Sequence, residues 1–314
     1  MKETVFPLHR VNRARALILT ALLPVDAGWA QTKPNIPLFS VELRIVVLQA
    51  TVKNKAGEMV TGLKREAFTV FEDGKRQPVT LFNREDVPVS LGIAIDNSGS
   101  MRLKREKVEA AALALVRASN PEDEVFVLNF GDKVRVDVPF TQSLALLEAG
   151  IARVDSIGGT ALRDAIEAGE TYLDQRARHK RRALLVITDG VDNASTVTAE
   201  GIRKHADRSE VTIHAIGLLS DEQPARAAKA RHDLDDLTEA TGGIAYFPKG
   251  LDEVSAIALD LAHQIRSQYT IAYTPLRQEL DGSYRKLRVE AKGFVDLKVR
   301  ARAGYVAAPR PSSP

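Results

Sequence analysis

Three short polar loops hold the side chains of this 314-residue chain that are best suited to chemistry. The first lies in IAIDNSGSMR, residues 93–102, where an apolar run stops at an acid and two serines follow around a glycine. The second is GGTAL, residues 158–162, and the third is TDG, residues 188–190. Glycine in each loop lets the backbone bend without steric cost. The oxygen-bearing side chains that we single out are Asp96, Ser98, Ser100, Thr160 and Asp189.

These five side chains have the chemistry of a site for a hard divalent cation. Mg²⁺ takes six oxygen ligands in a tight octahedron at about 2.0–2.1 Å and keeps several waters. Three hydroxyls and two carboxylates supply oxygens without filling that shell. Because Asp96, Ser98 and Ser100 alternate along one segment, their side chains can all point toward the same ion. We therefore expect the five residues to bind Mg²⁺, with Mn²⁺ and Ca²⁺ as alternatives. Few negative charges in contact would leave the ion able to accept an outside carboxylate.

Each loop also has a plainer structural interpretation. The first could be a helix N-cap followed by turn residues, and the third could be only a turn. We favour the metal site because the three loops occur together, each beside a predicted strand end or helix start. The neighbouring Asp192 and Asn193 are interpreted as solvated loop residues and not as ligands.

The elements that must position these loops alternate between strands and helices over residues 89–268. Short β-branched runs such as VSLGIAI and RALLVITD alternate with helical patterns, which predicts an α/β fold with a doubly wound, mostly parallel sheet covered on both faces. Ligands bind such sheets at the carboxyl ends of the strands, near the point where strand order reverses. The helices are expected at about residues 104–118, 161–177, 225–243 and 254–268.

Segments with β texture flank this region on both sides. Residues 31–88 and 269–308 contain alternating strands and Asp-Gly turns. Neither piece alone has enough strands to bury a face, so we expect the two to pack together as a small split β-sandwich. The α/β domain, residues 89–268, would be inserted between them. Residues 309–314 are rich in Pro and Ser and are expected to form a loose tail.

The three loops together resemble the metal-ion-dependent adhesion site of von Willebrand factor type A (VWA) domains. The resemblance covers about residues 88–268 and rests on Asp96-x-Ser98-x-Ser100, the threonine of GGT and the aspartate of ITDG. It implies that the two serines contact the ion directly and that the acids often act through water. It also implies that an Asp or Glu carboxylate of a partner protein completes the coordination.

The flanking segments resemble those of a more narrowly defined protein family. FEDGKRQPVTLF, IRSQYTIAYTP and RAGYV are similar to segments of an exported bacterial, acidobacterial-type family of von Willebrand factor A-related proteins. This resemblance bears on architecture more than on biochemical activity.

The first thirty residues have the pattern of a secretory signal peptide. A basic segment precedes an apolar stretch, and Gly28-Trp29-Ala30 offers small residues for cleavage. The apolar stretch is too short to span a membrane, so we expect an exported protein, periplasmic or secreted, with no transmembrane span in the mature chain. Residues 1–30 carry four basic and two acidic side chains, hence +2 of the net +3. The remaining +1 argues against nucleic-acid binding.

The absence of cysteine excludes thiol catalysis and Cys-ligated zinc, and leaves stability to core burial. The six histidines show no zinc-binding spacing. The basic run at residues 176–182 could suit lipid or nucleic acid, but it follows a predicted helix, where cations suit the negative end of the dipole, and we favour this second interpretation.

We interpret the chain as a non-enzymatic, metal-dependent protein-binding module. One alternative is a scaffold of an envelope complex in which the metal is mainly structural. Another is a metal-assisted hydrolase with Asp96 as the nucleophile, but the usual second acid two residues later is replaced by Ser98, which cannot act as a general acid near neutral pH. Related adhesion domains shift their last helix on ligand binding, so a shift of residues 254–266 would pull on residues 269–308.

Overall fold

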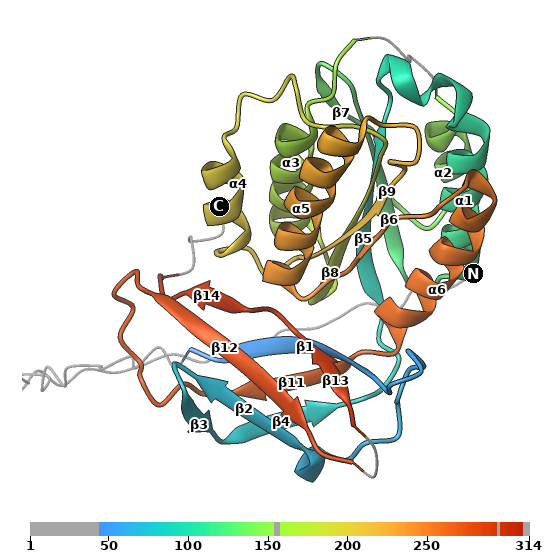
Figure 1. Ribbon diagram of the computed structural model, residues 1–314. Helices are drawn as coiled ribbons and strands as arrows, with labels where there is room; N and C mark the ends of the chain where they lie inside the picture. Colours follow the sequence, from blue (N-terminus) through green and yellow to red (C-terminus); the bar gives the residue numbers. More distant parts are fainter. Residues whose placement is uncertain (1–43, 154–157, 294–295, 310–314) are drawn as a thin grey trace, which may run out of the picture. The chain divides into compact units, whose positions relative to one another are not determined.

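The computed structural model describes residues 44–153, 158–293 and 296–309, which belong to one compact unit, Leu43–Pro314 (Figure 1). The expected signal peptide lies outside the described residues, and so does most of the expected tail. No helix in the described part of the chain is both long enough and apolar enough to cross a membrane.

A six-stranded sheet in the order β10-β9-β8-β5-β6-β7 forms the centre of the α/β part (Figure 1). Strand β7 runs antiparallel to β6, and the other neighbouring strands are parallel. Every residue of β5, β6, β8 and β9 is buried except one, Arg182, which is partly buried, as expected for strands covered on both faces. The strands are β5 (Val89–Asp96), β6 (Glu124–Phe130), β7 (Val134–Thr141), β8 (Arg181–Thr188), β9 (Thr212–Gly217) and β10 (Ala245–Tyr246).

Three helices cover each face of this sheet. Helices α1, α2 and α6 contribute to one hydrophobic cluster with the sheet, and α3, α4 and α5 contribute to the other (Figure 1). Alternate residues of β5 divide between them, because Ile93 and Ile95 point to the first cluster and Ala94 to the second. The helices are α1 (Arg105–Ala118), α2 (Leu144–Ile151), α3 (Leu162–Arg176), α4 (Ala199–Ala206), α5 (Pro224–Thr241) and α6 (Val254–Arg266).

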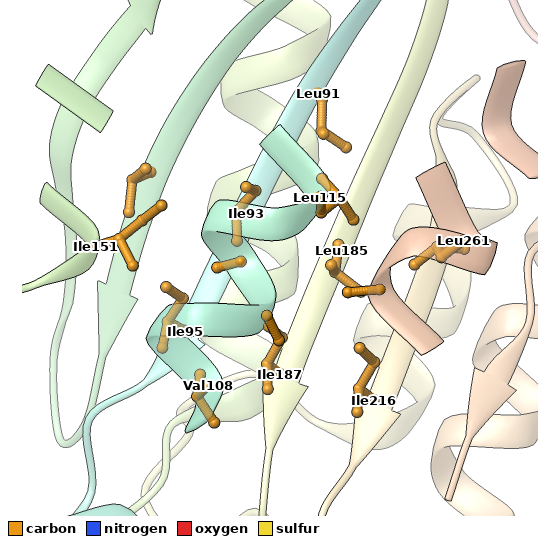
Figure 2. Close-up of a cluster of buried hydrophobic side chains, with 14 of the residues drawn as sticks. Leu91, Ile93, Ile95, Val108, Leu115, Ile151, Leu185, Ile187, Ile216 and Leu261 are labelled. Atoms are coloured by element: carbon orange, nitrogen blue, oxygen red, sulfur yellow. The ribbon is translucent and has the colours of Figure 1, made fainter. Parts of the chain in front are cut away.

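Figure 2 shows the first of these clusters, where α1 and α6 meet the central strands. Leu115 of α1 and Leu261 of α6 pack against the side chains of β5, β8 and β9, such as Ile93, Leu185 and Ile216. All five side chains are fully or almost fully buried. This core fixes the ends of β5 and β8, from which two of the three polar loops depart.

Two antiparallel sheets are built from both flanks of the α/β part. Their strand orders are β13-β1-β11-β4 and β14-β12-β2-β3, so each sheet combines strands before residue 84 with strands after residue 268. The strands are β1 (Val46–Lys53), β2 (Phe68–Glu72), β3 (Lys75–Gln77), β4 (Val79–Asn83), β11 (Tyr269–Tyr273), β12 (Tyr284–Ala291), β13 (Lys298–Arg300) and β14 (Gly304–Val306). Short 3₁₀ helices are η1 (Arg65–Ala67), η2 (Gly99–Leu103) and η3 (Leu251–Glu253).

A buried acid links these two sheets. Glu72 of β2 accepts hydrogen bonds at the same carboxylate oxygen from the hydroxyls of Tyr273 on β11 and Tyr305 on β14, at 2.6 and 2.9 Å. Tyr273 belongs to the other sheet, so the carboxylate ties the two layers together while its own polarity is satisfied.

The predicted fold class is confirmed. The chain has a mostly parallel α/β sheet and additional antiparallel sheets formed by both flanks. Three elements were not expected from the sequence: the antiparallel edge strand β7 and the helices α2 and α4.

Candidate metal centre

Two of the three polar loops leave the same edge of the central sheet. Strands β5 and β8 are parallel neighbours, and Ile95 lies opposite Ile187. The next residue of each strand, Asp96 and Thr188, is its last. The chain therefore delivers the DxSxS loop and the TDG loop side by side, at the carboxyl edge where α/β sheets bind ligands.

Asp96 lies at the base of the site and is fully buried. One carboxylate oxygen accepts a hydrogen bond from the Thr188 hydroxyl at 2.7 Å, and the other accepts one from the Ser98 amide at 2.8 Å. Burial raises the pKa of Asp96 to about 6, although these hydrogen bonds act in the opposite direction. A nearby cation would favour the ionised form of such a carboxyl group.

The two serines and Asp189 form a contiguous row of oxygens. Ser98 Oγ lies 3.1 Å from Ser100 Oγ, and Ser100 donates a hydrogen bond of 2.8 Å to Asp189 Oδ1. The row is built where the chain turns into η2 directly after Ser98. Ser100 is exposed while Ser98 and Asp189 are buried, so solvent reaches the row from the Ser100 side.

Thr160 is buried and is held against the loop after β8. Its backbone N–H donates to Asn193 Oδ1 at 2.8 Å, and the Asn193 N–H donates to the Thr160 carbonyl at 3.1 Å. A Cβ atom on Gly190 would lie 3.7 Å from Thr160 Oγ1, which places this hydroxyl beside the residue that follows Asp189. The Thr160 hydroxyl therefore lies next to the third loop.

Gly158, the first residue of the GGT motif, is required by the backbone geometry of the second loop. Gly158 has a φ of +90°, a conformation that other residues rarely adopt, and a Cβ atom there would lie 2.0 Å from Asp132 Oδ2. Its carbonyl accepts the Gly99 N–H at 3.4 Å, and Asp132 Oδ1 accepts the Gly159 N–H at 2.5 Å. The second loop is thus fixed to the first loop and to the segment after β6.

A lysine that follows the first loop also contacts the site. Lys104 Nζ lies 2.7 Å from Asp189 Oδ2 and 3.5 Å from Asp221 Oδ2. Lys104 is buried and directly precedes α1. The two oxygens of Asp189 therefore have different partners, a serine hydroxyl on Oδ1 and an ammonium group on Oδ2.

The structure brings four of the five predicted residues into one hydrogen-bonded cluster, and places Thr160 on the adjoining loop. Sequence reasoning missed the supporting residues Thr188 and Lys104. The interpretation of Asp192 as a solvated residue was wrong, because its side chain is only 5% exposed and pairs with Arg163 at 3.0 Å. Asn193 is exposed, as expected, and its side chain also accepts the Thr160 N–H. The available signals were weak: Thr188 precedes Asp189 directly, and Lys104 follows Ser100 by one helical turn.

The donor set fits a small, hard cation. Two neighbouring ligands of an octahedral Mg²⁺ lie about 3.0 Å apart when each is about 2.1 Å from the ion, and the row of oxygens has separations of 3.1 and 2.8 Å. Hydroxyls outnumber carboxylates in this set. In the described part of the chain, no group of three or more His, Cys, Asp or Glu side chains is arranged to hold a metal ion.

Comparisons with known proteins agree with this fold. Residues 91–191 match the sequence model of the von Willebrand factor type A domain, and the matched stretch contains all five candidate residues. A von Willebrand factor type A structure from Catenulispora acidiphila is similar with a TM-score of 0.50 and 14% identity, over 86% of this chain and 74% of that one. The D319A mutant of the PilB minor pilin from Streptococcus sanguinis is similar with a TM-score of 0.50 and 11% identity, over 59% and 63% of the two chains. A search among curated proteins found no match.

Proposed function

We propose that this chain, whose residues 91–191 match the sequence model of the von Willebrand factor type A domain, is an exported protein-binding module whose site holds a divalent cation. The ion, for which Mg²⁺ is our first choice, is bound by Asp96, Ser98, Ser100, Thr160 and Asp189. It completes its coordination with an Asp or Glu carboxylate of a partner protein. Export rests on the expected signal peptide at residues 1–30.

The observation that carries the proposal is the row of oxygens from Ser98 through Ser100 to Asp189, with separations suited to neighbouring ligands of one ion. Each residue has a distinct part. Ser98 and Ser100 present hydroxyl oxygens, and Asp189 orients Ser100 by accepting the hydrogen bond that the Ser100 hydroxyl donates. Asp96 holds the Ser98 amide and thereby fixes the turn that aims both serines.

The bound cation would supply positive charge for an incoming carboxylate. The protein side of this recognition is a shell of mostly neutral oxygens, which leaves much of the ionic charge uncompensated. Ser100 is exposed, so a carboxylate side chain of a partner can reach the row. One well-placed ionic contact of this kind gives specificity as well as affinity.

The geometry argues against the hydrolase alternative. Asp96 is fully buried at the base of the site, so a substrate would have to displace neighbouring side chains to reach its carboxylate. An aspartate nucleophile needs an oxygen lone pair directed at the substrate. The site therefore suits binding better than covalent catalysis.

One double alanine variant with a matched control tests the proposal. Ser98→Ala combined with Ser100→Ala removes both hydroxyl donors and should weaken Mg²⁺ binding in calorimetric titration by at least about tenfold, since even outer-shell partners of metal ligands are worth 10–100-fold. The exposed Ser143, at the start of α2, gives the control Ser143→Ala, which should bind Mg²⁺ as the wild type does.

The partner is sought by capture from envelope extract on the immobilised mature protein, with Mg²⁺ and with EDTA. A protein captured with Mg²⁺ and lost both with EDTA and with the double variant is the expected result. Capture that EDTA leaves undiminished would remove the metal from the mechanism. A metal that is mainly structural would instead show itself as a lower melting temperature in EDTA, with capture unchanged below that temperature.

A further inference from the structure

Lys104 occupies a position that the proposed function does not use. Its ammonium group lies 2.7 Å from Asp189 Oδ2 and 3.5 Å from Asp221 Oδ2. The side chains of Lys104 and Asp189 are 9% and 1% exposed, so their ion pair is buried, whereas the side chain of Asp221 is 73% exposed. Asp221 lies in the loop after β9, next to the third loop in the sheet order.

The same carboxylate serves both the row of oxygens and the lysine. Asp189 Oδ1 accepts the Ser100 hydroxyl, and Oδ2 accepts the Lys104 ammonium. A divalent cation beside Ser100 and an ammonium group on Oδ2 are two positive charges on one buried carboxylate. Charges this close interact strongly when water is largely excluded, so each cation lowers the affinity of the site for the other.

The second acid gives the ammonium group another partner. Asp221 is within ion-pairing distance of Lys104 but is mostly solvated, and a solvated pair contributes little by itself. A lysine side chain is long and flexible enough to keep its charge near Asp221 while leaving Asp189. The structure therefore offers the ammonium group a buried carboxylate partner and, beside it, an exposed one.

We propose that Lys104 is a built-in counter-ion of the site, which competes with the divalent cation for Asp189 and shifts to Asp221 when the cation binds. This inference rests on the proposed metal site. It adds that Lys104 sets the affinity of that site for the divalent cation. Lys104 neutralises Asp189 when no divalent ion is bound, and a divalent ion must displace it. Removing the lysine charge should tighten cation binding and, without the cation, leave a buried carboxylate unpaired.

The test uses Lys104→Gln, which keeps a hydrogen-bond donor but no charge, and Lys104→Met, which keeps only the length. Calorimetric titration of the full-length mature protein with MgCl₂ and MnCl₂ should show at least about tenfold tighter binding in both variants than in the wild type. The control is Lys107→Gln, which removes the same charge from the exposed face of α1. Its affinity should stay within about twofold of the wild type.

Thermal melting supplies a second measurement that a merely structural role would not reproduce. In EDTA both Lys104 variants should melt below the wild type, and saturating Mg²⁺ should restore them to or above it. A loss of stability that Mg²⁺ does not restore, together with unchanged or weaker cation binding, would overturn the inference.

Asp221→Asn keeps the buried pair and tests the proposed exchange even if the Lys104 variants fold poorly. It should weaken Mg²⁺ binding several-fold, because the ammonium group then has only Asp189. In a Lys104→Gln background the same change should have little further effect. An equal effect in both backgrounds would mean that Asp221 attracts the ion directly, and would contradict the exchange.

The outcomes separate this inference from the proposed function. If the wild type binds Mg²⁺ and the Lys104 variants bind it no better, the inference fails and the metal site stands. If only the Lys104 variants bind Mg²⁺, the inference holds, and metal-dependent capture by the wild type is ruled out. If no form binds Mg²⁺ or Mn²⁺, both fail.

Discussion

Glu170 is a buried carboxylic acid of α3 that is not one of the candidate ligands. Its side chain is fully buried, and the His205 imidazole of α4 lies 3.8 Å away. Burial raises the pKa of Glu170 well above its usual value, and the negative charge of Asp174 adds to this, while Ser209 and Arg302 act in the opposite direction. The folded protein therefore holds this proton more tightly than the unfolded chain does.

The raised pKa predicts how stability depends on pH at this residue. Because the native state binds the proton more tightly, stability is lost as pH rises from the ordinary glutamate pKa toward the folded pKa. Glu170→Gln cannot ionise and should not lose this stability. Its melting temperature should exceed that of the wild type by about 3 °C or more at pH 8, roughly 1 kcal/mol, and by much less at pH 4.5.

The control for this experiment is Glu167→Gln on the same helix, whose side chain is 42% exposed. Its melting temperature should follow that of the wild type at both pH values. A Glu170→Gln protein that is less stable than the wild type at pH 8 would mean that the ionised carboxylate is stabilised by its neighbours, and would contradict the pH argument.

At the scale of residues, sequence reasoning identified the side chains that lie close along the chain and missed those that meet through the fold. Asp96, Ser98 and Ser100 share one short segment, and their alternation was visible at once. The partners that complete the cluster come from a distance: Lys104 and Thr188 bond to residues 85 and 92 positions away. No local pattern marks a contact of this kind, because it depends on which strands become neighbours.

At the scale of elements, Arg181 joins β8 to the junction of α6 and β11. Its guanidinium group donates to three carbonyls of that junction, at Ile265, Arg266 and Gln268, and to the Thr270 hydroxyl. Arg181 is buried. Within the basic run at residues 176–182, Arg181 therefore serves this junction and not the end of α3, where the sequence predicted its charge to act.

Replacing this arginine should destabilise the fold. Arg181→Gln cannot reach the same acceptors and would leave buried carbonyls unpaired, at a cost of about 1–3 kcal/mol for each unsatisfied group. Urea unfolding should show a loss of roughly 2–4 kcal/mol. The matched control is Arg178→Gln, whose side chain is 81% exposed, and which should change stability by less than about 1 kcal/mol. Equal effects of the two changes would contradict the role of Arg181.

The expected helices and central strands appear within a few residues of their predicted ends, since their apolar periodicity is strong. The sequence did not predict β7 and α2, between β6 and α3, or the eight-residue helix α4 after β8. Strand β7 has four exposed or partly exposed residues at its start, as an edge strand can, and α2 has only eight residues. Elements with so few buried positions give little periodic signal.

At the scale of the whole molecule, hydrogen bonds connect the antiparallel sheets with the α/β part at several places. The backbone N–H groups of Ala303 and Val306 donate to the carbonyls of Ala240 and Asp207. The partly buried Arg302 donates to the carbonyls of Ser209 and Ala206. Together with Arg181, these bonds give α4, α5 and α6 direct links to the strands after residue 268.

These links make coupling between the candidate metal centre and the flanking sheets testable. The resemblance to adhesion domains implies a shift of α6 when the site closes on a ligand, and Arg181 would pass it to β11. Hydrogen exchange with Mg²⁺ and captured partner, compared with EDTA, should show slower exchange in the three loops and altered exchange in residues 269–308. Changes confined to the loops would mean that the site and the sheets act independently.

The division of the antiparallel sheets between the two flanks affects how the protein is made. Strand β1 pairs with β11 and β13, and β2 pairs with β3 and β12. During synthesis, β1 therefore emerges from the ribosome before either of its neighbouring strands, and β2 emerges with only β3 to pair with. About two hundred further residues must be synthesised before the missing neighbours are available. During that interval the nascent chain carries apolar strands with unpaired edges, which are prone to pair with other chains. Translocation in an unfolded form would avoid this hazard, because the two halves of each sheet would meet only after the last strand has arrived.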